Sequence, residues 1–363
     1  MTSLLDVRGL MVELPTAAGW VRPVNEVSLR IGAGEALGLV GESGSGKTML
    51  SLALMGLLPA GARVSGEAWL ENEVREVRDV KEVKDKSASP SDGGLRKNLT
   101  KLSEADWQQL RGREIAMVFQ EPMTSLNPVM RAGAQVEEAI RAHEPRMRAD
   151  EVRARALEAL RLAAVPEPEV RAEQFPHQLS GGLRQRVMIA MAIAAGLNGV
   201  EKKANVSAKE IGEGAGAHSR LLIADEPTTA LDVTVQKQIL ELLDRLRREL
   251  ALGLLFITHD LGVVAQVADR VAVMYAGRIV EEGPAKEVLA APRHPYTQGL
   301  LKASPSLERS ELVPIPGSVP RLNALPPGCS FEPRCALRRA ECVTAVPALR
   351  TASPSHAARC VLV

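Results

Sequence analysis

The stretch ALGLVGESGSGKT, residues 36–48, decides the fold. Its first part, residues 36–40, is a short apolar run and predicts a buried parallel strand. Its second part, GESGSGKT at residues 41–48, fits the pattern G-x-x-x-x-G-K-[ST], and residues 48–58 predict an apolar helix. The glycines let successive backbone N–H groups point at phosphate oxygens, and the start of the helix adds the positive end of its dipole. Strand, glycine loop and helix in this order therefore predict a phosphate-binding site.

The loop also predicts how a nucleotide would be held. Lys47 would reach the β- and γ-phosphates, and the hydroxyl of Thr48 would hold Mg²⁺. An accidental glycine loop is the alternative, but the flanking strand and helix favour the phosphate site. The candidate nucleotide-binding residues of the loop are Gly41, Glu42, Ser43, Gly44, Ser45, Gly46, Lys47 and Thr48.

Two further apolar strands end in polar residues that suit the same chemistry. LLIADEP, residues 221–227, ends in Asp225, which would support Mg²⁺, and Glu226, which could polarise an attacking water. Taken alone, two acids after a strand more often begin a helix, so the pair gains its meaning from the glycine loop. ITHD, residues 257–260, puts His259 just beyond another strand, where it could contact a γ-phosphate or serve a structural role.

Composition excludes several classes of protein. The 363 residues carry 45 Lys and Arg against 44 Asp and Glu, a net charge of +1, which argues against a dedicated polyanion binder. Aromatic residues make up 2%, too few for a module that stacks on nucleic-acid bases. The longest apolar run, residues 187–197, is shorter than the ~20 residues of a membrane-spanning helix. No signal peptide is recognised at the N-terminus, so we expect a cytoplasmic protein.

The chain divides into segments of different character. Residues 7–12 and 24–31 predict strands, and strand, helix and strand over residues 221–258 predict part of a parallel sheet. Residues 71–98 and 199–219 interrupt the pattern with charge, Gly and Ser and are interpreted as surface insertions. From about residue 286 the Pro content rises, which predicts an irregular tail.

LSGGLRQR, residues 179–186, completes a set of motifs with the glycine loop, DEPTTALD (residues 225–232) and ITHD. Together they resemble an ATP-binding-cassette (ABC) ATPase subunit over nearly the whole chain. The resemblance implies an α/β fold: a P-loop NTPase core with an N-terminal antiparallel β subdomain, an inserted α-helical subdomain and an irregular C-terminal extension that contains the cysteines. It also implies two ATP molecules held between two cassettes, so that neither subunit has a complete site alone.

Roles in the family carry over to matching positions. The resemblance implies that Glu226 is the general base, His259 the switch histidine, and Gln120 the glutamine that senses Mg²⁺ and the attacking water and couples to the membrane partner. Lys47 belongs to the catalytic set, and Thr48, Gln120 and Asp225 to the Mg²⁺ set. Residues implied to contact the ATP of the opposite cassette or to organise the dimer interface are Ser180, Gly181, Gly182 and Asp232.

Narrower motifs point within the family. HPYTQGLL (residues 294–301), PIPGSVP (residues 314–320) and LPPGCSFEPRC (residues 325–335) resemble the dipeptide/oligopeptide importer ATPases, a subfamily that nickel importers share. The resemblance implies a peripheral subunit at the cytoplasmic face of the inner membrane. Its implied partners are two transmembrane permease subunits, a second ATPase subunit and, indirectly, an extracytoplasmic solute-binding protein, with no nucleic acid. A soluble ABC ATPase that acts on nucleic acid is the alternative from another class.

Four cysteines lie in the last 35 residues: Cys329, Cys335, Cys342 and Cys360. In a reducing compartment, clustered cysteines are more often metal ligands than disulfides. Four thiolates could hold Zn²⁺ or an iron–sulfur cluster. The alternative to a metal site is four buried thiols that bind no metal. In the resembled subfamily the equivalent cysteines are associated with a [4Fe–4S] cluster.

The resemblance divides the chain into four parts. They are the first part of the ATP-binding core at residues 1–120, the helical signature subdomain at 121–198, the second part of the core at 199–285, and the extension at 286–363.

Overall fold

The computed structural model describes residues 3–17, 19–71, 96–121, 125–197, 220–229, 231–304 and 313–363. Most of the two expected insertions, residues 71–98 and 199–219, lies outside the described residues. The described ends of the first insertion belong to two paired strands, β4 (Arg63–Glu71) and β5 (Arg96–Asn98).

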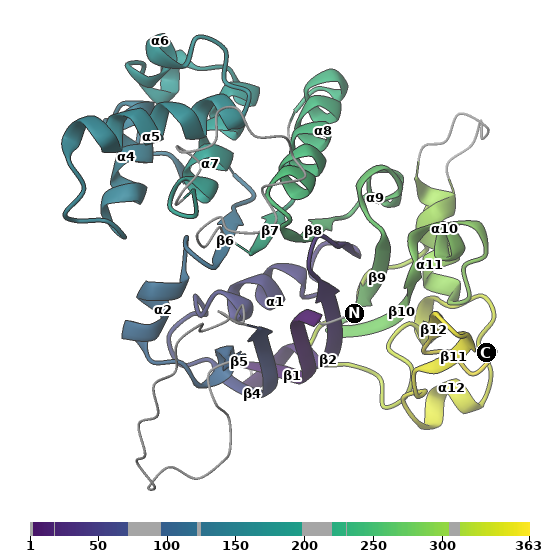
Figure 1. Cartoon of the computed structure of the whole chain (residues 1–363). Helices are drawn as coiled ribbons and strands as arrows, with labels where there is room; N and C mark the ends of the chain where they lie inside the picture. Colours follow the sequence, from purple (N-terminus) through teal and green to yellow (C-terminus); the bar gives the residue numbers. More distant parts are fainter. Residues whose placement is uncertain are drawn as a thin grey trace, which may run out of the picture.

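An eight-stranded sheet has the order β11-β12-β10-β9-β3-β8-β7-β6. Its β6 end lies toward the helical group α4–α7, and its β11 end lies beside the C-terminal helix α12 (Figure 1). Neighbours from β9 to β6 pair in parallel, whereas β10, β11 and β12 pair antiparallel. The strands are β3 (Ala36–Val40), β6 (Ile115–Val118), β7 (Leu221–Asp225), β8 (Gly253–Thr258), β9 (Arg270–Tyr275), β10 (Arg278–Pro284), β11 (Arg350–Ser353) and β12 (His356–Ala358).

The parallel strands are buried on both faces. In β3, Ala36 and Val40 join one hydrophobic core, and Leu37 and Leu39 join the other. Burial on both faces is typical of parallel sheets and explains why these strands read as continuous apolar runs.

A second, antiparallel sheet has the order β2-β1-β4-β5, with β1 at Ser3–Thr16 and β2 at Gly19–Gly32. Its buried residues share a core with Leu50 and Leu54 of helix α1 (Lys47–Leu54). The helix ends before residue 58, the end that the sequence predicts, and Gly56 follows with φ 62°.

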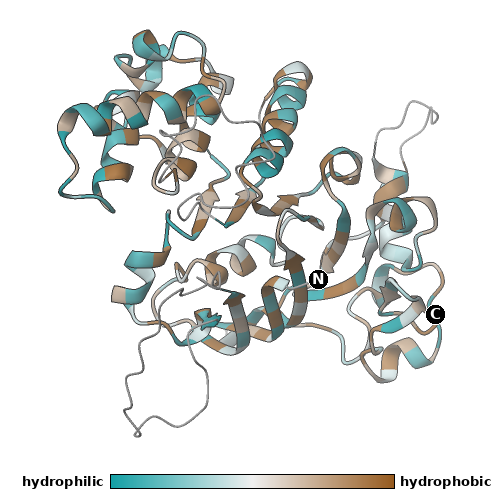
Figure 2. Cartoon of the chain, in the orientation of Figure 1, coloured by the Kyte–Doolittle hydropathy of each residue, from teal (hydrophilic) through white to brown (hydrophobic). Residues whose placement is uncertain are grey.

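Helices α4–α7 form a group of their own beyond β6, and the other helices lie around the two sheets (Figure 1). Helix α8 shows the amphipathic division plainly in Figure 2, because Ile239, Leu243 and Leu246 are buried on one side. The helices are α2 (Glu104–Leu110), α4 (Ala132–Arg141), α5 (Ala149–Leu162), α6 (Pro168–Ala172), α7 (Gly181–Ala194), α8 (Val233–Glu249), α9 (Leu261–Val267), α10 (Ala285–Ala290), α11 (Pro295–Ala303) and α12 (Glu341–Thr344). Short 3₁₀ helices lie at η1 (Leu99–Lys101), η2 (Pro176–Gln178) and η5 (Glu332–Arg334). Within the described part of the chain, no helix is long and apolar enough to span a membrane.

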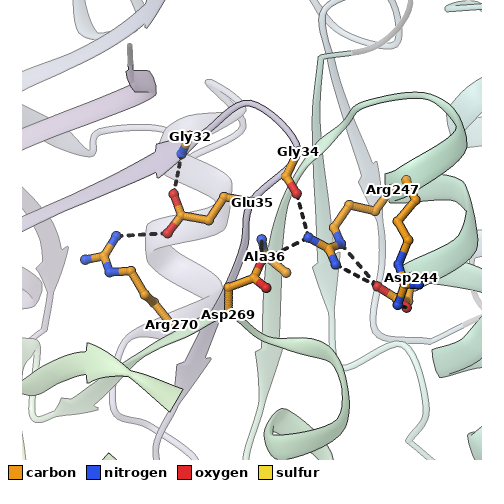
Figure 3. Close-up of polar contacts among 9 residues, drawn as sticks. Gly32, Gly34, Glu35, Ala36, Asp244, Arg247, Asp269 and Arg270 are labelled. Atoms are coloured by element: carbon orange, nitrogen blue, oxygen red, sulfur yellow. Dashed lines mark hydrogen bonds and ion pairs between the residues drawn. The ribbon is translucent and has the colours of Figure 1, made fainter. Parts of the chain in front are cut away.

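A polar network holds the N-terminal end of β3 (Figure 3). Arg247 of α8 donates to the carbonyl of Gly34 at 2.5 Å and to Asp269 Oδ2 at 2.9 Å. Asp269 Oδ2 also accepts from the N–H of Ala36 at 2.9 Å. One aspartate therefore joins α8, β3 and the segment before β9, at the end of β3 opposite the glycine loop.

The tail is more ordered than its Pro content predicts. It contains helix α11 and the strands β11 and β12, which extend the main sheet beyond β10. Glu281 of β10 is fully buried and lies 2.7 Å from His356 Nε2 of β12. This buried contact joins the tail to the main sheet, and no pattern in the sequence predicts it.

Candidate nucleotide-hydrolysis site

Four parallel strands bring their C-terminal ends to one edge of the main sheet. Pairing runs from β3 to β8, from β8 to β7 and from β7 to β6, so the segments that follow these strands are neighbours. These segments are the glycine loop at residues 41–48 and the residues His259, Asp225 with Glu226, and Gln120. The edge therefore gathers the candidate catalytic residues from distant parts of the sequence.

The glycine loop requires glycine at two positions for lack of space. A Cβ on Gly46 would lie 1.9 Å from the carbonyl oxygen of Pro23, and Gly46 has φ 107°. A Cβ on Gly41 would lie 2.2 Å from the carbonyl oxygen of Met274. Neighbouring backbone thus surrounds the loop, which fixes its path between β3 and α1. Ser45 is fully buried, whereas Ser43, Gly44 and Thr48 are exposed.

Lys47 is buried and folds back onto its own loop. Its Nζ donates to the carbonyl oxygens of Gly41 at 2.7 Å and Glu42 at 3.1 Å, and lies 4.0 Å from Glu226 Oε1. Burial lowers the pKa of the Lys47 ammonium, and the carboxylates of Glu226, Asp225 and Glu42 oppose that shift. The cation is therefore held at the loop by carbonyl oxygens and nearby carboxylates.

Asp225 offers an oxygen that suits a divalent cation. Its Oδ1 is buried without a hydrogen-bond partner, while Oδ2 accepts from Ser51 Oγ at 3.3 Å. Burial raises the pKa of the Asp225 carboxyl, which hydrogen bonds from Thr48 and Ser51 counteract. An orphaned carboxylate oxygen beside the Thr48 hydroxyl fits a hard cation such as Mg²⁺, and the sequence did not single out Ser51.

Glu226 is the meeting point of the site. Its Oε2 lies 3.2 Å from Gln120 Nε2, 3.0 Å from Thr229 Oγ1 and 3.3 Å from His259 Nδ1. The residue has φ 45°, an uncommon backbone conformation for a non-glycine residue. The structure thus brings Gln120, Glu226 and His259 together as candidates, and Thr229 joins them although the sequence did not single it out. In the sequence, Thr229 is marked only by its place in the DEPTTALD motif, as the second threonine.

The LSGG motif lies elsewhere in the chain. Ser180 caps the start of α7 and accepts from the N–H of Leu183 at 3.3 Å, and a Cβ on Gly182 would lie 2.6 Å from Val235 of α8. Asp232 caps α8 and accepts from the N–H of Val235 at 3.0 Å. Among the residues that the structure describes, no hydrogen bond joins Ser180, Gly181 or Gly182 to the glycine loop. Ser180, Gly181 and Asp232 are exposed instead.

The four cysteines line one small apolar cavity of about 10 Å³ in the tail. All four are free, and a backbone hydrogen bond of 2.8 Å from Cys329 to Cys342 brings two of them close. Burial raises the pKa of Cys329 to about 11 and also raises the pKa of Cys335 and Cys360. A cavity of this volume has room for about one water, and the described residues contain no group of three or more His, Cys, Asp or Glu arranged to hold a metal. The thiols converge, but as arranged here they do not form a ligand set.

Comparison with known proteins agrees with this geometry. Residues 24–198 match the ABC transporter family, and residues 280–342 match the family described as Oligopeptide/dipeptide transporter, C-terminal region. The chain is 45% identical to the oligopeptide transport ATP-binding protein OppD of Bacillus subtilis, over 92% of this chain and 82% of that protein. It is 44% identical to a Brucella melitensis protein named "Putative peptide import ATP-binding protein", over 99% of this chain and 96% of that one.

Solved structures show the same fold. The dimeric post-hydrolysis structure of the ATP-binding cassette MJ0796, bound to ADP and phosphate, aligns with a TM-score of 0.57 at 26% identity. It covers 77% of this chain and 98% of that one. The cbiO1 protein of Clostridium perfringens, part of the ABC transporter complex cbiONQ, aligns with a TM-score of 0.55 at 25% identity, over 80% and 92% of the two chains.

The fold and the site define an ATP-binding-cassette ATPase, whose reaction converts ATP and water to ADP and phosphate. Within that class, the chain belongs to the ABC transporter family as an ATP-binding subunit of the oligopeptide/dipeptide type. The family and the fold that the sequence predicts are confirmed.

Proposed function

We propose that this ATPase powers the import of peptides through a membrane permease. The observation that carries the catalytic part is the contact of Glu226 with Gln120, His259 and Lys47 at one edge of the sheet. The C-terminal region and the names of the relatives support a peptide as cargo. Nickel or another small solute is the alternative cargo.

The contacts of Glu226 suit a general base. Its carboxylate would accept a proton from the water that attacks the γ-phosphate, while Gln120 and His259 orient that water and the carboxylate. Lys47 would exchange the carbonyl oxygens of Gly41 and Glu42 for phosphate oxygens when ATP binds. Thr48, Gln120 and Asp225 are the proposed Mg²⁺ residues, and the ion would neutralise charge on the phosphates.

The exposed LSGG residues suit a second cassette. We expect Ser180, Gly181 and Gly182 to contact ATP bound by the partner, because a helix start binds anions well. Asp232, exposed at the start of α8, would lie at the same interface. Contacts that exist only in the closed dimer let ATP favour closure, and hydrolysis then reopens it. The helical subdomain at residues 121–198 is the part that we expect to transmit this motion.

The proposed partners follow from the family. Two transmembrane permease subunits would receive the motion near Gln120, and a solute-binding protein would deliver the cargo from outside. The second ATPase subunit is either a second copy of this chain or a paralogue. The chain would then act as a peripheral protein at the cytoplasmic face of the membrane.

Copurification and uptake test this function together. We expect the tagged chain to copurify with two multi-span permease subunits, and a deletion strain to lose uptake of di-, tri- or oligopeptides. Loss of nickel uptake with normal peptide uptake would assign the alternative cargo. Copurification with nucleic acid and without a permease would contradict a transport role and favour the soluble ABC ATPase.

We further propose that the four tail cysteines bind a metal centre, either a [4Fe–4S] cluster or, as the alternative, Zn²⁺. Their convergence on one cavity supports this proposal, and thiolate donors suit both centres, but binding requires the thiols to move from the arrangement described above, which forms no ligand set. Thiolate–iron charge transfer predicts broad absorbance near ~400 nm in anaerobically purified protein. A colourless, iron-free preparation with stoichiometric zinc would contradict the cluster, and a metal-free preparation would contradict both.

A further inference from the structure

Glu42, the second residue of the phosphate-binding loop, has all three of its polar groups held. Its N–H donates to the hydroxyl of Tyr296 at 2.8 Å, and its carbonyl oxygen accepts from Lys47 at 3.1 Å. Its two carboxylate oxygens accept from Nη1 and Nη2 of Arg334 at 2.7 and 3.0 Å. Tyr296 and Arg334 both lie in residues 280–342, outside the stretch that matches the ABC transporter family. Residues of the tail, outside the segment that matches the ABC transporter family, therefore hold the phosphate-binding loop by hydrogen bonds and an ion pair.

Arg334 is itself held in place. Its side chain is only 4% exposed, and its Nε donates to the carbonyl oxygen of Pro316 at 2.8 Å. The same guanidinium lies 5.9 Å from the ring centres of Tyr275 and Phe331. A planar guanidinium that meets both oxygens of a carboxylate gives a strong, directional contact that lysine cannot copy. The contacts of Arg334 with Pro316 and Phe331 therefore fix the position of the guanidinium that binds Glu42.

The three tail motifs meet at this contact. HPYTQGLL supplies Tyr296, PIPGSVP supplies the carbonyl oxygen of Pro316, and LPPGCSFEPRC supplies Phe331 and Arg334. The catalytic chemistry at the sheet edge uses none of these motifs. Tyr296 and Arg334 bind Glu42 directly, and Pro316 and Phe331 contact Arg334.

We propose that Arg334 is a positioning residue for the phosphate-binding loop: its paired contact with Glu42 holds the start of the loop in the conformation that binds the phosphates of ATP. The C-terminal extension thereby sets the ATP affinity of the cassette. The inference rests on ATP binding by this family and not on the identity of the cargo. Arg334 contacts Glu42 and not the Glu226 carboxylate, so its loss would weaken binding more than it slows the chemical step.

Arg334→Lys tests this role because it keeps the charge and loses the paired contact. We expect the Kd for ATP of the full chain to rise about 10-fold, with a matching rise in KM and a kcat close to that of the wild type. Tyr296→Phe keeps the ring but removes the hydroxyl, and should raise the Kd about threefold. Arg338→Ala is the matched control, because Arg338 is an exposed arginine of the same tail that pairs with Glu332 at 3.4 Å.

A double-mutant cycle with Glu42→Gln separates positioning from simple stability. If Arg334 acts through Glu42, the double variant binds ATP no more weakly than the worse single variant. Additive losses would overturn the proposed link. An unchanged Kd together with a lower melting temperature would leave only a structural role and overturn the proposal. Should Arg334→Lys fail to fold, an unchanged Kd in Tyr296→Phe and Glu42→Gln would overturn it equally.

Discussion

Glu226→Gln is the sharpest test of the hydrolysis site. The substitution keeps the shape of the side chain and its neighbours but removes the proton acceptor. In the wild type, Oε2 lies 3.0–3.3 Å from Gln120 Nε2, Thr229 Oγ1 and His259 Nδ1, and the side chain is 15% exposed. An amide can keep part of these contacts, so we expect the variant to fold.

The expected loss comes from the chemical step alone. A general base contributes about 10²–10⁴-fold to a rate, so kcat should fall about 1,000-fold, or about 4 kcal/mol of barrier. The Kd for ATP should not rise, because removal of a carboxylate 4.0 Å from Lys47 takes a negative charge away from the phosphate site. The variant should therefore retain ATP and accumulate as the closed dimer.

Phosphate release and gel filtration with ATP and Mg²⁺ measure both effects. Glu241→Gln is the matched control, because Glu241 is exposed on α8 and its ion-pair partner, Lys237, lies 3.9 Å away on the surface of the same helix. Turnover by Glu226→Gln within about tenfold of the wild-type rate would refute the assignment of Glu226 as the base. Loss of ATP binding would refute the proposed separation of binding from chemistry.

Three further predictions concern binding and stability. Lys47→Ala should weaken ATP binding at least about 100-fold in equilibrium titration, because a buried charge-assisted contact to phosphate is lost. His356→Ala should lower the free energy of unfolding by about 3 kcal/mol in urea titration, because it removes a partner of the fully buried Glu281. Burial lowers the pKa of His294 to about 4, below the ~6.5 of an unfolded histidine. Above pH 6.5 both states carry a neutral His294, so its contribution to the free energy of unfolding is full. Between pH 6.5 and 4 only the unfolded chain binds the proton, and the free energy of unfolding falls by about 1.4 kcal/mol per pH unit. His294→Asn, which keeps a capping side chain for α11, should remove that slope in urea titrations at each pH.

Much of the sheet edge can be predicted from the sequence. Short apolar runs that end in GESGSGKT, in Asp225 and Glu226, or in His259 indicate buried parallel strands with polar residues at their C-terminal ends. The carboxyl ends of neighbouring parallel strands share one edge of the sheet, where ligands bind. Strand order and the contacts of Thr229 follow from pairing in three dimensions, which periodicity does not encode.

The contact between Arg334 of the tail and Glu42 of the phosphate-binding loop could not be predicted from the sequence. Arg334 and Glu42 are 292 residues apart, and a single arginine in a Pro-rich segment fits no spacing rule. The strands β11 and β12 were also missed, because they are three or four residues long and carry no clear alternation. Their stability comes from pairing with β10, which is a tertiary effect.

Peptide-stimulated ATP hydrolysis by the reconstituted complex tests the proposed transport function most directly. The complex of this chain with its permease would be placed in lipid vesicles that hold the solute-binding protein on the outer face. We predict that a peptide added on that side raises the rate of phosphate release in the wild-type complex and leaves the Glu226→Gln complex inactive. Stimulation by nickel or by nucleic acid, with no response to peptides, would contradict the proposal.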